Sequence, residues 1–369
     1  MEKARFVKTG KDSFFGEYLY EKTVPEGHFL RKLKQEIDWD RFTHKLIKLY
    51  KGEGLVGRPP FDPAMLLKIE LVAYLYNLSE RQVEVYINEN LPAKYFVGLA
   101  VDESAPDHST LTVFRDRLLK RGKLKIFKEM LEEIVRIALE KGIQFGSIQL
   151  IDSVHSVANV NTAKDRQRDK NDKGPHDPDA QWGAKHKQTI KKADGSEETR
   201  TQYFYGYKTH TSMNAETGII TSVEVTSGEA FDGHHFCSLV DHDIEQDIQV
   251  ETYAADKAYD DTENHFYLQE NNLHSAIRLK NSRTNKKDPN KQPWQELKKT
   301  AQYQLGSKER YKIERKFGEA KQTHGFGKCR YIGKPKYLFQ ATFVAMVLNL
   351  KRIIKMTVGV GFKTQAFAD

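Results

Sequence analysis

The sequence predicts an α+β protein, in which an N-terminal helical domain is followed by a mixed β-sheet flanked by helices. Apolar residues recur at helical spacing through the first 140 residues. From about residue 145 onward, short strand-like runs alternate with helical stretches, which is typical of a sheet with helices packed on it. Because 369 residues exceed the size at which one hydrophobic core stops growing, more than one domain is expected. We therefore predict a helical domain over residues 1–140, a sheet domain over 141–356 and a tail over 357–369.

The helical domain is expected to begin its helices at recognisable sequence signals. Apolar spacing predicts a first helix over residues 29–50, and Asp62-Pro63 starts a second, because proline is favoured in a first helical turn. The capping-box sequence SERQ at residues 79–82 opens a third helix. Residues 107–110 start a fourth, and residues 124–140 form a fifth.

The fourth helix continues into a basic cluster that suggests DNA binding. The cluster consists of Arg115, Arg117, Lys120 and Arg121. Short helices joined by tight turns, one of them ending in basic residues, fit a helix-turn-helix-like unit, so we predict that these four side chains contact DNA. Many small helical bundles bind no nucleic acid, and that alternative stays open at this point.

The sheet domain is predicted from alternating and β-branched runs. Expected strands lie at residues 147–161, 202–211, 219–225, 248–255 and 275–279, the second and third of them forming a hairpin. Expected helices lie at residues 232–243, 260–271, 308–323 and 337–356. The highly polar residues 161–200 are expected to be a mobile inserted loop, and a second, basic loop is expected over 280–292.

Charged residues are distributed unevenly along the chain. The net charge of +8 divides into +3 for residues 1–150, −11 for residues 151–270 and +16 for residues 271–369. Because phosphate contacts of Lys and Arg release counterions, the basic C-terminal third indicates a polyanionic partner. An ordinary solvated surface is the alternative explanation.

Cysteine content and apolar stretches point to a cytoplasmic protein. Cys237 and Cys329 lie far apart and form no CxxC pair, which argues against a disulfide scaffold or a zinc site. Residues 1–10 lack the apolar core of a signal peptide. The most apolar stretch, residues 338–350, falls short of the roughly 20 residues needed to span a bilayer. We expect a buried helix there and no membrane partner.

Three acidic residues carry the clearest indication of chemistry. Asp152 and Asp256 each follow a short run that is typical of a buried strand, and Glu314 lies in a helical stretch rich in Lys and Arg. Carboxylates are costly to place at the end of an apolar strand unless a partner such as a hard divalent cation offsets the cost. Both strand ends can bring their carboxylates together at one edge of the sheet. Metal ions held by carboxylates in basic surroundings are suited to cutting and joining phosphodiesters.

Spacing around Glu314 strengthens this interpretation. Arg310 precedes Glu314 by four positions and Lys321 follows it by seven, so all three lie roughly on one helical face. Such a face can supply one metal ligand and two phosphate contacts. Glu319 is a rival third acid, although it fits this spacing poorly.

Several other residues keep alternative explanations. Asp260 or Asp261 could replace Asp256 as a ligand, but their position at a helix start favours capping. His234 and His235 beside Asp232 could suggest a transition-metal site, but without further ligands at fixed spacing we interpret these residues as a solvated helix start. Trp182 and Trp294 lie in polar segments, where each ring could stack on an unpaired base or pack within its loop.

The sequence resembles the cut-and-paste DDE transposases of bacterial insertion sequences, whose catalytic domain has the RNase H-like fold. The resemblance covers nearly the whole chain. The matching N-terminal segments are GRPPFDP at 57–63, LSERQ at 78–82 and PDHST at 106–110. The matching C-terminal segments are IDS at 151–153, YGYKTH at 205–210, ADKAYD at 255–260 and the Arg310, Glu314, Lys321 signature. One departure is Ser307, where the family often has tyrosine, which weakens any role of that tyrosine but not the metal site.

The resemblance implies a mechanism, a cofactor and partners. Two Mg²⁺ ions, with Mn²⁺ as a substitute, would be held by Asp152, Asp256 and Glu314 and would activate water to attack a phosphodiester at the transposon end. The released 3′-hydroxyl would then attack target DNA. Arg310, Lys321 and Lys208 would contact DNA, including the scissile or neighbouring phosphate. The implied partners are the terminal inverted repeats, target DNA and a second copy of the chain in the synaptic complex, all in the bacterial nucleoid.

Two other functions use the same features. A structure-selective nuclease could cut with the same carboxylates without joining ends. A domesticated DNA-binding protein would keep the basic surfaces and lack catalysis, although the intact acidic triad with its Arg and Lys argues against that.

Overall fold

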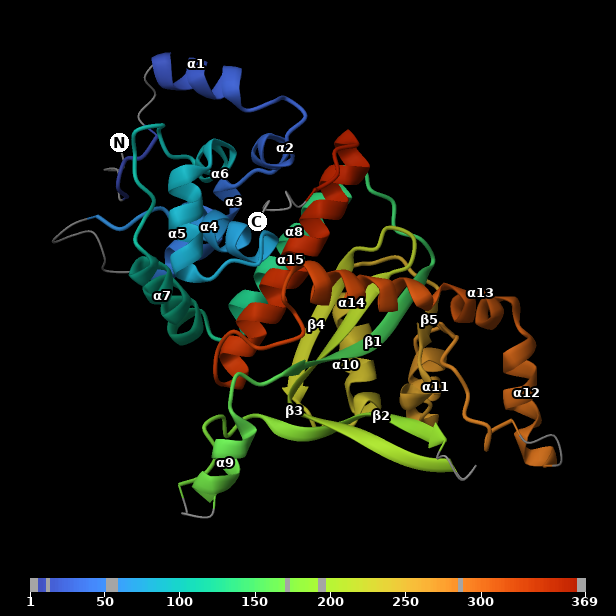
Figure 1. Cartoon of the computed structure of the whole chain (residues 1–369). Helices are drawn as coiled ribbons and strands as arrows, with labels where there is room; N and C mark the ends of the chain where they lie inside the picture. The colour runs from blue at the N-terminus through green and yellow to red at the C-terminus, as the bar shows by residue number, and fades with distance from the viewer. Residues whose placement is uncertain are drawn as a thin grey trace. The chain divides into compact units, whose positions relative to one another are not determined.

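The computed structural model describes residues 6–10, 14–50, 59–169, 173–191, 197–284 and 288–363. Contacts divide the chain into two compact units. The helical unit comprises Met1–Ile143 with Phe343–Asp369, and the sheet unit comprises Gln144–Thr342. A helical N-terminal region followed by a mixed sheet with flanking helices confirms the predicted fold class (Figure 1).

The helical unit is built from short helices. Their bounds are α1 Phe14–Thr23, α2 Phe29–Glu36, α3 Asp40–Leu46, η1 Ile47–Tyr50, α4 Pro63–Leu75, α5 Glu80–Glu89, α6 Leu91–Val97, α7 His108–Arg117, the π turn η2 Leu118–Gly122, and α8 Lys125–Glu140. The predicted caps are confirmed, because Asp62 caps α4 and Ser79 forms a capping box with Gln82. The single helix predicted over 29–50 is wrong. Extended backbone at Ile37 ends α2, and the buried indole of Trp39 donates to the carbonyl oxygen of Leu33 at 3.3 Å.

The sheet unit contains one six-stranded mixed sheet. Its strands are β1 Ile148–Val157, β2 Gln181–Lys191, β3 Glu197–Asn214, β4 Ile220–Ser227, β5 Thr252–Ala255 and β6 His274–Ser275. Their order is β2-β3-β1-β5-β6, and β4 also pairs with β3. The β1–β3 pairing is antiparallel, whereas the β1–β5 and β5–β6 pairings are parallel.

Helices cover both faces of the central strands. The helices from residue 162 onward are α9 Thr162–Asp169, η3 Asp232–His235, α10 Phe236–Glu245, η4 Lys257–Tyr259, α11 Thr262–Glu270, η5 Pro289–Lys291, α12 Gln292–Lys299, α13 Ala301–Glu309, α14 Tyr311–Thr323 and α15 Lys334–Val358. On one face, Ile151 of β1 and Ala255 of β5 pack in a core with Phe236 of α10 and Leu268 of α11. The opposite face is packed by α13 and α14 (Figure 1). Since side chains alternate along a strand, Asp152 lies on this second face.

The expected loop over residues 161–200 is wrong for most of its length. Residues 162–169 form α9, and residues 181–191 form β2, which pairs with β3 from Glu197 onward. The two short stretches 170–172 and 192–196 lie outside the described residues. Most of residues 181–191 are polar, so the sequence carries no regular apolar–polar alternation that would predict a strand there. The basic loop expected over 280–292 also ends early, because η5 and α12 begin there.

Two further helix boundaries differ from expectation. The helix predicted over 308–323 is divided at Arg310 between α13 and α14. The buried helix expected at 338–350 is confirmed within α15. From Phe343 onward α15 groups with the helical unit, where Phe343 packs against Tyr74 at 5.5 Å between ring centroids, whereas we expected the sheet domain to extend to residue 356.

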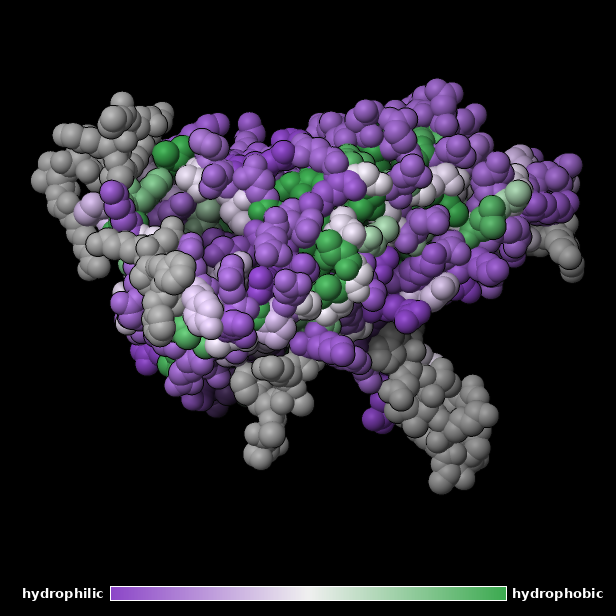
Figure 2. All heavy atoms as spheres, turned by 90° about the horizontal axis from the view of Figure 1, so that it is seen from above, coloured by the Kyte–Doolittle hydropathy of each residue, from purple (hydrophilic) through white to green (hydrophobic). Residues whose placement is uncertain are grey.

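Length and composition would let α15 cross a membrane, but 83% of its most apolar window is buried inside the protein. Packing accounts for that apolar character. Hydrophilic side chains dominate the face drawn in Figure 2, and hydrophobic ones lie there in small groups, which is ordinary for a folded chain.

Close packing of α13 on the sheet depends on Gly306. A Cβ atom at this position would lie 2.5 Å from the Cβ of Ala276 and 3.2 Å from the Cβ of Ala254. We predict that Gly306→Ala lowers the free energy of unfolding by about 1–3 kcal/mol through overpacking. The matched control is Gly318→Ala in α14, where a Cβ meets nothing within 4 Å. This control should be neutral or stabilising by up to about 1 kcal/mol. Urea unfolding measures both, and equal midpoints for the two variants would contradict the packing.

Candidate catalytic site

Strand register brings the first two acidic residues together. Ile151 of β1 pairs in parallel with Ala255 of β5. Asp152 follows Ile151, and Asp256 follows Ala255. The two aspartates therefore occupy neighbouring positions at this point of the sheet. Asp152 is still within β1, whereas Asp256 follows β5 directly. The backbone N–H groups of Ser153 and Lys257 each donate to the carboxylate before them, at 2.8 and 2.6 Å, which orients both side chains.

Arg310 connects the third acidic residue to this pair. It lies at the junction of α13 and α14, and its side chain is 13% exposed. Its Nη2 is 3.6 Å from Oδ1 of Asp256 and 3.8 Å from Oε1 of Glu314. The structure therefore brings Asp256, Glu314 and Arg310 into one cluster, as the helical-face spacing suggested.

Negative charge accumulates around Asp152. Burial raises the pKa of the Asp152 carboxyl to about 7, while the Ser153 N–H and the positive charge of Arg310 act in the opposite direction. The charges of Asp256 and Asp232 raise that pKa further. A desolvated carboxylate beside further carboxylates is unfavourable unless a cation shares the space. Grouped carboxylate oxygens of this kind are the donors that hard divalent cations prefer, so Asp152, Asp256 and Glu314 fit a metal site.

Sequence reasoning gave no role to Asp232 at this site. Its Oδ2 accepts from the Ser153 hydroxyl at 3.0 Å, and its Oδ1 accepts from Nζ of Lys208 at 2.9 Å. Lys208 also donates to the carbonyl oxygen of Ala230 at 2.8 Å. The ammonium of Lys208, which we expected to contact DNA, is thus engaged in supporting the residue next to Asp152. These residues come together because β1 and β4 both pair with β3 and Asp232 follows β4, so no local sequence signal points to Asp232.

The histidines that follow Asp232 have partners elsewhere. His235 bonds Glu224 at 2.9 Å, and its ring stacks on that of His210 with centroids 4.4 Å apart. His234 packs edge-on against the ring of Phe231. A transition-metal site formed with Asp232 finds no support in these contacts.

Each rival acid has a structural partner. Asp260 is buried and bonds His265 at 3.0 Å and Arg283 at 2.7 Å. Asp261 caps α11. Glu319 pairs with Lys316 at 3.4 Å.

The two candidate stacking rings differ in their surroundings. The guanidinium carbon of Arg283 lies 4.6 Å from the ring centroid of Trp294, which also contacts His265. Trp182 is 46% exposed, and its ring lies 5.4 Å from that of Tyr205.

Basic residues predicted for the helical unit are mostly engaged within it. Arg115 is buried and forms an ion pair with Glu80. Arg117 lies 4.0 Å from the ring centroid of Tyr50, and Arg121 donates to the carbonyl oxygen of Leu49 at 2.7 Å. Lys120 has a side chain that is 79% exposed and sits 3.6 Å from Asp116. Of the four, Lys120 is therefore the one most available to a phosphate.

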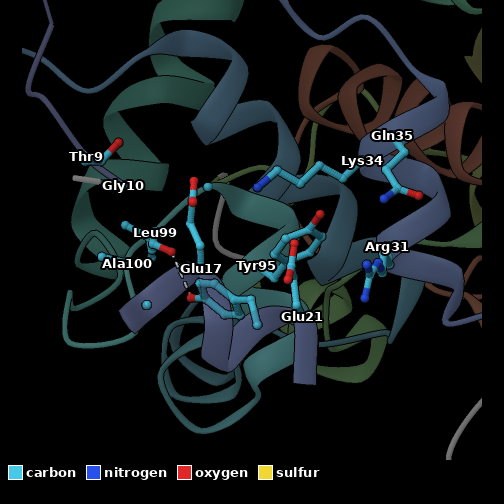
Figure 3. Close-up of a pocket in the computed structure, with 13 residues that line it drawn as sticks. Thr9, Gly10, Glu17, Glu21, Arg31, Lys34, Gln35, Tyr95, Leu99 and Ala100 are labelled. Atoms are coloured by element: carbon cyan, nitrogen blue, oxygen red, sulfur yellow. Dashed lines mark hydrogen bonds between the residues drawn. The ribbon is translucent and has the colours of Figure 1, made fainter. Parts of the chain in front are cut away.

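A cleft of about 440 Å³ also lies in the helical unit (Figure 3). Glu17, Glu21, Arg31 and Lys34 line it, with Nζ of Lys34 4.0 Å from the ring centroid of Tyr95. Because both signs of charge line this cleft, it does not resemble a phosphate groove.

A mixed sheet with flanking helices that presents clustered carboxylates beside an arginine is consistent with the RNase H-like class of enzymes of phosphodiester chemistry. Comparison with protein families is more specific. Residues 18–117 match the family described as "Transposase domain (DUF772)", and residues 145–350 match the family described as "Transposase DDE domain". The second match covers more than half of the chain, so the protein belongs to the DDE transposases of insertion-sequence type. It is an enzyme of DNA transposition that binds DNA and uses divalent metal ions.

We predict that the contact between Lys208 and Asp232, 2.9 Å long, contributes measurably to stability. Lys208→Met leaves a partly buried carboxylate without its cation and should cost about 1–3 kcal/mol in EDTA. Asp232→Asn should cost a similar amount, and the double variant should cost less than the sum by at least about 1 kcal/mol. Urea unfolding of all four proteins gives this coupling energy. Additive losses would show that the two side chains do not support each other.

Proposed function

We propose that Asp152, Asp256 and Glu314 hold two Mg²⁺ ions, for which Mn²⁺ substitutes, and that the enzyme cleaves transposon ends and joins them to target DNA. The observation that carries the proposal is the arrangement of Arg310, which contacts Asp256 and Glu314 together and also acts on Asp152. When bound, one ion activates the attacking oxygen and the other stabilises the leaving oxygen.

The remaining residues position the substrate and the carboxylates. Arg310 has a guanidinium that can donate to phosphate in two parallel hydrogen bonds, and it lies beside two of the ligands. Lys321 lies on α14, as Glu314 does, and supplies a further positive charge for the DNA backbone. Lys208 and Asp232 hold Ser153, and through it they fix the orientation of the Asp152 segment.

The proposal extends to the partners of the enzyme. The helical unit would recognise the terminal inverted repeats, with Lys120 as its most exposed predicted contact. Pairing two ends requires a homodimer in the synaptic complex, and the bacterial nucleoid in the cytoplasm is where both ends and target lie.

Metal binding can be tested separately from catalysis. Calorimetric titration with Mn²⁺ should show that Glu314→Gln weakens binding by more than the roughly 10–100-fold that outer-shell changes produce. Glu319→Gln is the matched control, because Glu319 lies on the same helix and pairs with Lys316. This control should bind like the wild type. Equal affinities for wild type and Glu314→Gln would remove Glu314 from the metal site.

Transposition itself is tested with a plasmid that carries the DNA segments flanking the gene. With Mg²⁺, the wild type should release the segment and join its ends to a second plasmid, whereas Asp256→Asn should yield neither product. Cut ends that are never joined would instead identify a nuclease. Binding without cleavage in both Mg²⁺ and Mn²⁺ would identify a DNA-binding protein that has lost catalysis.

A further inference from the structure

The β2–β3 hairpin projects beyond the end of β1. β3 pairs with β1 from Gly206 to Asn214 and with β2 from Glu197 to Gly206 (Figure 1). The half of β3 that pairs with β2 therefore continues past Val157, the last residue of β1. Together with β2 it forms a two-stranded extension of the sheet. This extension lies beyond the C-terminal end of β1, which is also the direction in which β1 continues after Asp152.

Strand β2 contains an irregularity at Lys185. Ala184 pairs with Tyr203, whereas His186 pairs with Gln202, so Lys185 is an extra residue without a partner in the ladder. In an uninterrupted strand Lys185 would point to the face opposite Ala184. A β-bulge breaks this alternation and re-aims a side chain, and bulges are common beside active sites. Lys185 is exposed.

Ala184 lies on the same face of the sheet as Asp152. Asp152 pairs with Thr211 of β3, and from there every second residue of β3, down to Tyr203, lies on the same face. Trp182 of β2 stands opposite Tyr205 on this face. Tyr203 is 64% exposed and Trp182 is 46% exposed. Exposed aromatic rings beside basic residues are typical of surfaces that bind nucleic-acid strands.

Lys321 of α14 lies near the end of β1, where the β2–β3 hairpin begins. It follows Glu314 by seven residues, which is about 10 Å along a helix. Its Cγ lies 3.9 Å from where a Cβ of Gly327 would be, and the carbonyl oxygen of Gly327 accepts from the backbone N–H of Val157 at 3.0 Å. Lys321 is thus beside the end of β1, where the hairpin begins to project.

The two lysines are within electrostatic reach of each other. Burial lowers the pKa of the Lys321 ammonium, and the positive charge of Lys185 lowers it further. Two ammonium groups that repel each other are stabilised when an anion binds beside both.

We propose that Lys185 and Lys321 together bind the DNA backbone where it leaves the carboxylate site, and that the bulge in β2 creates the contact made by Lys185. The inference rests on the proposed function, since it assigns a second phosphate contact to the same site. DNA phosphates supply the anion, and each contact releases counterions and strengthens binding.

Salt dependence of DNA binding tests this contact. Fluorescence anisotropy with a short labelled duplex of random sequence, in EDTA, gives the slope of log affinity against log salt concentration. Lys185→Gln should reduce the magnitude of this slope by about 0.9 and weaken binding about five- to tenfold at about 0.1 M salt. Lys185→Gln with Lys321→Gln should reduce it by about 1.8. The control is Lys298→Gln, an exposed lysine of α12 in the same unit, which should match the wild type.

The outcomes separate this inference from the proposed function. A wild type that cleaves DNA with Mg²⁺, together with an unchanged slope for Lys185→Gln, would overturn the Lys185 contact alone. A wild type that neither binds nor cleaves DNA would overturn the proposed function and the contact with it. The thermal unfolding midpoint of Lys185→Gln is the folding control. A midpoint equal to that of the wild type would show that any change in slope reflects the lost charge and not misfolding.

Discussion

The carboxylate of Asp152 is the group on which the rest of the site depends. It is held in a desolvated position next to Asp256 and near Asp232, and its raised pKa measures how unfavourable its negative charge is there. Charge in such a place lowers the stability of the folded state unless other groups offset it. The Ser153 N–H and Arg310 offset part of it. A cation bound beside these carboxylates, as proposed, would offset the remainder and would stabilise the fold by the same interaction.

The fold keeps these charges together through packing on both sides of β1 and β5. Parallel register places Asp152 and Asp256 side by side, and a buried apolar core under the opposite face keeps the strands in that register. On the catalytic face, Gly306 lets α13 lie against Ala254 and Ala276 without a side chain between them. The chain then bends at Arg310, so that α14 carries Glu314 toward the strand ends. A helix seated further from the sheet would move Glu314 away from Asp152 and Asp256.

Much of the candidate site could be predicted from sequence because its signals are local. Asp152 and Asp256 follow apolar strand-like runs, and the spacing of Arg310, Glu314 and Lys321 is visible as one helical face. Features fixed by distant contacts could not be predicted. Asp232, which follows β4, reaches Ser153 of β1 because both strands pair with β3.

The same limit explains the errors in secondary structure and in the helical unit. The polar strand β2 gains its hydrogen bonds from β3 and not from any pattern of its own. Arg115 looks like a surface cation in sequence, but Glu80, a residue of another helix, holds it in the interior. The helix predicted over 308–323 is likewise divided at Arg310, where α13, which packs on the sheet through Gly306, ends and α14 begins.

The most direct test of the account is to locate the metal. Crystals of the protein soaked in Mn²⁺ and measured near the manganese absorption edge would show bound ions as anomalous peaks. The account predicts peaks bounded by the carboxylate oxygens of Asp152, Asp256 and Glu314, with oxygen distances in the range of hard divalent cations. Ordered carboxylates with no anomalous peak between them, or manganese bound at another cluster, would contradict it.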